Sequence, residues 1–121
     1  MGRMNVQAEV RKRLEAALGG VAVRTSVPDP RPAELVVVRR EGGRRQDALV
    51  DAPGVGVDVW ARTEARACEV AHAVADAMEA LPFADGFASV SEEVVASQYD
   101  RLARSPHWYL SYTLKTYETN R

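Results

Sequence analysis

The sequence predicts an α/β protein of the α+β type, a single domain in which two helices pack on one face of a mixed or antiparallel sheet. Two stretches with helical hydrophobic spacing and five short β-branched or alternating stretches give the order α-β-β-β-α-β-β. Each helical stretch carries one apolar stripe, and the two stripes need the same apolar layer. The length of 121 residues suits one hydrophobic core, so we expect one domain over residues 1–121.

Composition excludes several classes of protein. The chain is 46% hydrophobic and 27% charged, which is ordinary for a globular domain and not for a disordered chain. Sixteen basic and 17 acidic residues leave a net charge of −1, so the chain as a whole does not attract nucleic acid or an anionic membrane. Cys68 is the only cysteine, and no apolar run approaches the ~20 residues of a membrane span. We expect a soluble, cytoplasmic protein without a secretion signal.

The first helix is expected over residues 5–18. Asn5 is a favourable N-cap, because its side chain can accept a hydrogen bond from the first turn. Gly19-Gly20 supplies the left-handed stop after the last turn. Apolar residues recur between them at helical spacing: Val6, Val10, Leu14, Ala17 and Leu18.

Two strands follow, separated by prolines. Residues 21–25 are short and β-branched, and the prolines at 28, 30 and 32 then impose an extended loop. The next strand, over 35–40, begins apolar on both alternating faces, which is typical of a strand covered from two sides.

A pair of glycines then predicts a hairpin tip. Gly42-Gly43 can adopt the positive φ of a tight turn, and the return strand would pass through 48–50. Residues 51–54 include Pro53 and are expected to break or bulge the ladder. Alternation resumes over 55–61, which predicts a clear strand.

The second half of the chain predicts a helix and two more strands. Thr63 is a favourable N-cap for a helix over 64–81 that Pro82 ends. A strand is expected around 88–96, followed by a polar stretch from Ser97 to Pro106. The chain closes on a strand over 107–117, in which apolar and polar residues alternate.

With both helices on one face, the second face of the sheet is left without a helix. Trp60 and alternate members of the 35–38 run would form apolar surface there. Exposed patches of this kind commonly mark protein interfaces, so we expect an oligomer or a docking surface.

No residues fit a catalytic, cofactor or metal site. The chain has no nucleophile elbow, phosphate loop or zinc-helix motif. Cys68 and His72 lie four residues apart on the second helix, but no third group completes a metal or nucleophile site. Packing roles are favoured for both residues.

The arginines from Arg39 to Arg45 are the most distinctive charged group. Fourteen of the 16 basic residues are arginine, and Arg39, Arg40, Arg44 and Arg45 against Glu41 give this segment a net charge of +3. Guanidinium groups suit phosphate or carboxylate partners. A solvated hairpin end, a nucleic-acid contact and an acidic protein partner all remain open.

Several of these strings together resemble a known family. They are the proline segment 27–32, the strand 35–40, the string from Asp51 to Ala61 that runs into an alanine-rich helix, and the closing strand 108–117. In this combination, over nearly the whole chain, the sequence resembles the tail terminator proteins of long-tailed phages and prophages. Small head-to-tail connector proteins share the size and much of the pattern.

The resemblance implies a structural, non-enzymatic virion protein of the tail neck region, present in the host cytoplasm during assembly. It implies a homo-oligomeric ring, commonly a hexamer, that ends growth of the tail tube and joins it to the head. The expected partners are further copies of the chain, the tail tube protein and the head-tail connector, with non-specific contact to DNA in the lumen and none to membrane.

By analogy, Asp58, Trp60 and Val37 are expected at the ring interface. Arg39, Arg40, Arg44 and Arg45 are expected in the lumen or against an acidic tube surface. Two other functions remain open: a head-tail connector or head-completion subunit, and a small nucleic-acid-binding α/β module that uses the arginines. A small enzyme using Cys68 and His72 is the least favoured.

Overall fold

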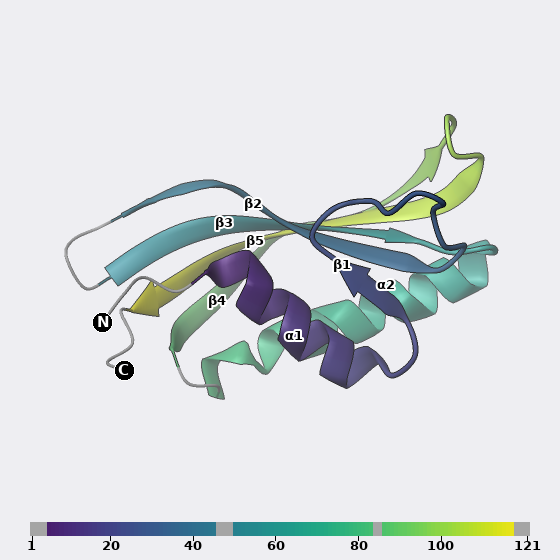
Figure 1. Cartoon of the computed structure of the whole chain (residues 1–121). Coiled ribbons are helices and arrows are strands. Elements are labelled where there is room, and N and C mark those ends of the chain that lie inside the picture. The colour runs from purple at the N-terminus through teal and green to yellow at the C-terminus, as the bar shows by residue number, and fades with distance from the viewer. Residues whose placement is uncertain (1–4, 46–49, 84–85, 118–121) are drawn as a thin grey trace.

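A computed structural model describes residues 5–45, 50–83 and 86–117 of the chain. Five strands form one sheet in the order β1-β2-β3-β5-β4, and two helices lie on one of its faces (Figure 1). β1 pairs with β2 in parallel and all other pairs are antiparallel, so the sheet is mixed. The predicted fold class and element order are confirmed.

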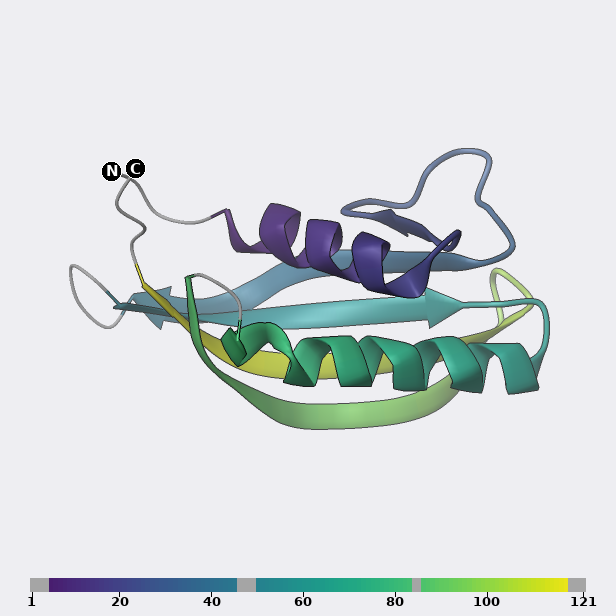
Figure 2. The same ribbon diagram turned by 90° about the horizontal axis from the view of Figure 1, so that it is seen from below.

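The two helices begin at the predicted caps. In α1 (Val6–Leu18) the Asn5 side chain accepts a hydrogen bond from the Ala8 N–H, and in α2 (Glu64–Glu79) Thr63 accepts one from the Arg66 N–H. A short 3₁₀ turn, η1 (Leu81–Phe83), follows α2. Figure 2, seen from the helix side, shows α1 and α2 side by side and running in opposite directions.

The hydrophobic core lies between the helices and the sheet. Each helix contributes the stripe predicted from its spacing, and alternate residues of the central strands face it. The largest fully buried side chains of this core include Tyr112, Leu14, Met78, Leu81, Leu110 and Leu114.

The predicted hairpin tip at Gly42-Gly43 is wrong. Both glycines lie within β2 (Leu35–Arg45), where the register with β3 shifts between Arg40 and Gly43 as in a β-bulge. Gly42 has φ +102°, so its positive φ serves a bulge and not a turn. The two strands are connected over residues 46–49, which lie outside the described residues, as do the predicted strand residues 48 and 49.

β3 (Val50–Trp60) runs as one strand through residues 51–54, where a break or a bulge of the ladder was expected. The bulge sits on the neighbouring strand β2, and Pro53 pairs there with Gly43. On its other side β3 is bridged to β5 at Asp51 and Gly54 but not at Pro53, which has no N–H to donate. The strand is therefore continuous, but its ladder to β2 shifts register and its ladder to β5 has no bridge at Ala52 and Pro53.

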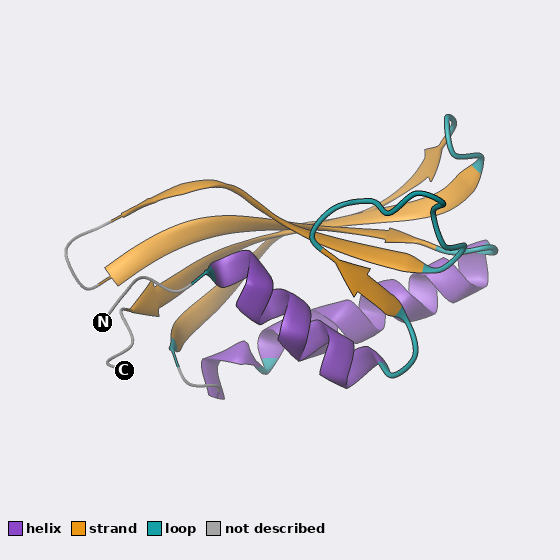
Figure 3. Ribbon diagram, in the orientation of Figure 1, coloured by secondary structure: helices purple, strands orange, loops and turns teal. Residues whose placement is uncertain are grey.

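The last two strands are longer than predicted. β4 (Phe87–Asp100) and β5 (Ser105–Tyr117) take up most of the segment expected to be a polar stretch, and residues 101–104 form the turn. Asp100 holds this turn, because its Oδ1 accepts hydrogen bonds from the N–H groups of Leu102 and Ala103, both at 3.0 Å. Figure 3 shows this long hairpin curving away from the helices at one end of the sheet.

The second face of the sheet is not the open apolar surface that the sequence predicted. Leu35, Val37 and Trp60 form a small cluster there with exposures of 0%, 2% and 9%. The proline loop between β1 (Ala22–Arg24) and β2 covers part of this cluster. Arg31 of this loop lies over the Trp60 ring, with 5.6 Å from its Cζ to the ring centroid. Helix packing is therefore not the only way this sheet buries apolar side chains.

No helix in the described part of the chain is both long enough and apolar enough to span a membrane.

Two leucines offer a test of the packing. Leu14 is completely buried in the core, whereas Leu102 is 100% exposed in the β4–β5 turn. Leu14→Ala should lower the free energy of unfolding by about 2–5 kcal/mol, because it leaves a cavity. Leu102→Ala should change it by less than about 0.5 kcal/mol. Urea unfolding of both variants measures the contrast, and equal effects would contradict this core.

Candidate functional site

The residues predicted for the ring interface share one face of the sheet. Asp58, Trp60 and Val37 all point away from the helices, but each is buried within the chain, with exposures of 6%, 9% and 2%. The exposure predicted for Trp60 and for the alternate members of the 35–38 run is therefore wrong, while the role of all three residues in an interface stays a prediction. Their contacts within the chain show what they do in the fold.

Asp58 is the centre of a polar cluster on this face. Arg39 Nη2 donates to Asp58 Oδ2 at 2.5 Å, and His107 Nε2 donates to Asp58 Oδ1 at 2.7 Å. The Asp58 side chain is only 8% exposed, and a buried carboxylate is tolerated when such partners satisfy it. The His107 ring also stacks on Trp60, with 5.0 Å between ring centroids.

Arg39 joins Asp58 to a second carboxylate. Its Nη2 lies 3.4 Å from Glu41 Oε2, and Glu41 accepts a further hydrogen bond from the Tyr109 hydroxyl. The Glu41 side chain folds across Gly56, where an added Cβ would collide with the carboxylate. The glycine thus leaves room for Glu41 to reach Tyr109. We call Arg39, Glu41, Asp58, His107 and Tyr109 the sheet-face cluster.

This cluster raises the pKa of Tyr109. The first cause is the hydrogen bond to Glu41, since the anionic acceptor favours the protonated phenol, and the second is burial. Burial and a hydrogen bond to Glu92 likewise raise the pKa of Tyr112, which lies in the core on the opposite face.

The β4–β5 turn is fastened to the end of β3 beside the cluster. Trp60 Nε1 donates to Asp100 Oδ2 at 2.9 Å, and Ser105 Oγ donates to the Ala61 carbonyl at 2.9 Å. The pKa of Asp100 is lowered, chiefly by the hydrogen bond from the Ala103 N–H and next by that from Trp60. These bonds fix the position of the turn relative to the sheet.

Of the four arginines predicted to act together, the structure describes the side chains of Arg39 and Arg40. Arg39 belongs to the sheet-face cluster, while the backbone N–H of Arg40 donates to Gln7 Oε1 of α1 at 2.9 Å. The Arg40 side chain also contacts the Gly42 carbonyl. The backbones of Arg44 and Arg45 pair with β3, but their side chains lie outside the described part of the structure.

The Cys68 and His72 pair lies on α2. Cys68 is half-buried, and the exposed His72 ring packs at a tilt against Trp108, with centroids 5.7 Å apart. Within residues 5–45, 50–83 and 86–117, no group of three or more His, Cys, Asp or Glu side chains is arranged to hold a metal ion.

Sequence reasoning missed the exposed apolar surface on β4. This 14-residue strand forms one edge of the sheet and is largely exposed. Val94, Val95 and Tyr99 on the strand and Leu102 in the turn are 41%, 39%, 59% and 100% exposed. The signal was present as Val94-Val95 and as two isolated apolar residues inside the segment that was expected to be polar. Val94 and Val95 are adjacent and lie on opposite faces of the strand, so this edge exposes apolar side chains on both faces of the sheet. We call these four residues the β4 edge surface.

Comparison with solved structures finds the same fold in a chain of the virion of a native gene transfer agent (GTA) particle. The TM-score is 0.70 over 93% of this chain and 95% of that chain, with 21% sequence identity. No protein-family profile matches the chain, and no curated protein matches it. The likeness shows a common fold over nearly the full length of both chains.

The sheet-face cluster predicts a pH dependence of stability. Because the pKa of Tyr109 is raised in the folded state, its protonated form adds stability that is fully present below the unfolded pKa of about 10. That stability is lost as the pH rises through the higher folded value. Glu41→Gln removes the charged acceptor and should reduce this alkaline loss.

The free energy of unfolding, measured by urea between neutral and strongly alkaline pH, tests this expectation. Glu15→Gln is the matched control, because Glu15 forms its ion pairs with Arg11 on α1 and Arg24 on β1. Tyr112 titrates in both variants and cancels in the comparison. Identical alkaline slopes for wild type and Glu41→Gln would show that Glu41 does not control Tyr109.

Proposed function

We propose that this chain is a non-enzymatic structural subunit of a phage or phage-derived virion. In this role it forms a ring, with six copies the expected number, on the end of the tail tube. The ring ends tube polymerisation and presents the surface for head-tail joining. The observation that carries the proposal is the shared fold with a virion chain over 93% of this chain, to which the resemblance to tail terminator proteins adds the specific position.

The two edge strands of the sheet differ in length, which supports a ring in which each copy presents one long unpaired strand to its neighbour. β1 has only three residues, whereas β4 offers a 14-residue edge. A closed ring needs a heterologous contact, in which one surface of a copy meets a different surface of the next. The β4 edge surface supplies one half of such a contact, with exposed apolar side chains and a strand that has no neighbour on its outer side in the described sheet.

The first half of β4 limits how this edge can pair. Glu92 and Glu93 place two charges on the strand, and its register with β5 shifts between Glu92 and Val94. Charges and bulges on an edge strand disfavour open-ended pairing with other chains. The contact we propose therefore lies toward Val94–Asp100 and the adjoining turn.

Contact of the Arg39–Arg45 segment with DNA in the lumen or with an acidic tube surface belongs to the same proposal. Arg39 contributes least to it, because its guanidinium group is held by Asp58 and Glu41. Arg44 and Arg45 would contribute most of this contact with DNA or the tube. In the virion the protein would sit in the tail neck, with the tube protein and the head-tail connector as its partners.

A head-tail connector or head-completion subunit is the second candidate. The virion chain with this fold supports any structural component of a particle, and the two candidates differ in partner. A connector would bind the portal side and leave tube length unchanged. Salt-sensitive DNA binding by the isolated chain would instead favour a nucleic-acid-binding module.

The test is to mix the purified protein with its cognate polymerising tube protein and to measure tube length by negative-stain electron microscopy. We expect short tubes with a density cap at one end. Long tubes without caps would contradict a terminator and favour the connector.

The double variant Val94→Lys/Val95→Lys should abolish the caps and restore long tubes. Docking on the β4 edge surface would then have to bury two lysine charges, which opposes the contact. Val27→Lys is the matched control, since Val27 is also exposed, at 51%, but lies on the proline loop. Capping by the double variant at the wild-type level would remove β4 from the ring contact.

A further inference from the structure

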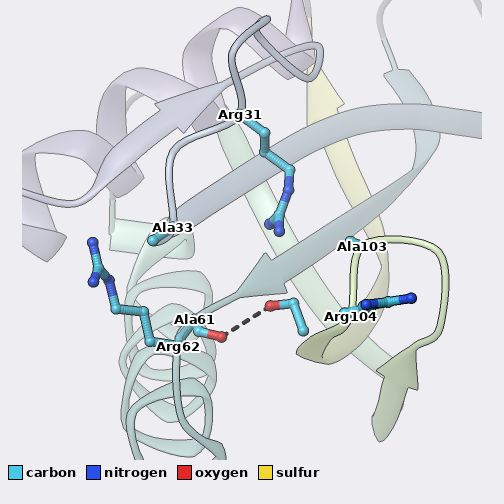
Figure 4. A pocket seen from close by; sticks show the side chains of 7 residues that line it. Arg31, Ala33, Ala61, Arg62, Ala103 and Arg104 are labelled. Carbon is cyan, nitrogen blue, oxygen red and sulfur yellow. Dashed lines mark hydrogen bonds between the residues drawn. The ribbon is translucent and has the colours of Figure 1, made fainter.

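A small pocket lined by three arginines lies where the proline loop, the end of β3 and the β4–β5 turn meet (Figure 4). Its volume is about 260 Å³. In Figure 4 Arg31 points from the loop into the pocket, while Arg62 and Arg104 flank it with their guanidinium groups turned outward. The lining residues are Arg31, Ala33, Ala61, Arg62, Ala103, Arg104 and Ser105.

Arg31 holds a hydrogen-bond donor for which the described residues provide no acceptor. Its Nη1 is buried and makes no hydrogen bond, although the same guanidinium group lies over the Trp60 ring. The ring face offers no acceptor atom to Nη1, so this contact leaves the donor without a hydrogen bond. Buried donors are almost always paired, so an unpaired one on a pocket wall points to an acceptor supplied from outside.

The nearby carboxylates are already engaged. Glu34 accepts two hydrogen bonds from Arg66, at 2.6 and 3.1 Å, and Asp100 is bonded to Trp60 and to its own turn. In the parts of the chain that are described, no ion pair is found for Arg31, Arg62 or Arg104. After the hydrogen bond from Arg66, Arg62 also helps to lower the pKa of Glu34, so the positive charge that the surroundings do not neutralise lies mainly on Arg31 and Arg104.

The backbone at Arg104 gives a second, independent observation. Arg104 has φ +52°, in the left-handed region where glycine is favoured and a side chain is strained. Non-glycine residues held in this region cluster at binding sites. Glycine would suit this turn position better for folding, and arginine places a guanidinium group at the pocket.

We propose that this pocket binds a carboxylate side chain from an acidic segment of a neighbouring protein. Arg31 is the fixed donor, and Arg62 and Arg104 close on the carboxylate by rotation of their exposed side chains. Arginine forks bind carboxylates through paired N–H donors. Binding at the pocket does not depend on whether the chain ends a tail tube.

Apolar neighbours favour a protein over nucleic acid. Leu102, fully exposed in the same turn as Arg104, would meet an apolar side chain flanking the bound carboxylate. Arginine and tryptophan at a small pocket, here Arg31 over the Trp60 ring, are typical of protein hot spots. A DNA backbone would instead need a stripe of basic residues, and this chain has a net charge of −1.

The test is binding of a dye-labelled, glutamate-rich peptide containing leucine to the full chain, measured by fluorescence anisotropy at low salt. Arg104→Gly and Arg62→Gln should each weaken binding roughly tenfold. Arg13→Gln, which removes an exposed arginine from α1, should not change it. Arg104→Gly should keep or raise the urea midpoint of unfolding, because it relieves the left-handed strain, so a loss of binding in that variant is not a loss of fold.

Competition separates the anion sources. A double-stranded DNA oligonucleotide and inorganic phosphate should displace the peptide only weakly. Tighter binding of the oligonucleotide than of the peptide, with the same sensitivity to Arg104→Gly, would overturn the proposal in favour of a nucleic-acid site. An equal loss with Arg13→Gln, or no peptide binding, would also overturn it.

Discussion

The Asp58 carboxylate, buried on the sheet face that carries no helix, is the interaction on which the rest of that face depends. A buried charge must be satisfied, and here Arg39 and His107 satisfy it from the two strands that flank β3. Arg39 extends the pairing to Glu41, and the bulge at Gly42 together with the bare surface of Gly56 lets Glu41 reach Tyr109. The His107 ring stacks on the Trp60 ring, and Trp60 donates a hydrogen bond to Asp100 in the β4–β5 turn. One chain of contacts thus joins the bulge of β2 to the turn at the opposite edge of the sheet.

The two edges of the sheet differ in length and in what covers them. The short β1 edge is followed by the proline loop, which covers the Trp60 cluster through Arg31. The long β4 edge keeps apolar side chains exposed, and its turn is fixed by Asp100 and Ser105. A rigid edge with exposed apolar residues costs little conformational entropy on binding, which suits a contact repeated around a ring. The arginine pocket lies beside this edge, so a protein that docks on the edge can also reach the pocket.

The sequence was sufficient for the features set by local chemistry. Asn5 and Thr63 cap the helices as predicted, and the apolar spacing of both helices matches their buried faces. The alternation in β3 placed Asp58 and Trp60 correctly on the face opposite the helices. Features that depend on residues distant in sequence were not predictable in this way. Gly42-Gly43 suits a turn or a bulge equally well, and pairing with β3 decides for the bulge. The burial of Trp60 depends on Arg31, 29 positions earlier in the chain, and the pocket joins three separate segments. No local pattern encodes such a meeting.

The central claim is that this chain joins its assembly through the β4 edge surface. Backbone amide hydrogen exchange, compared between the free chain and the chain bound at the ends of tubes, tests it most directly. We predict that the amides of residues 94–100 and of the adjoining turn gain protection on assembly, while those of α1 exchange as in the free chain. Protection gained over the helices with no change along β4 would contradict it.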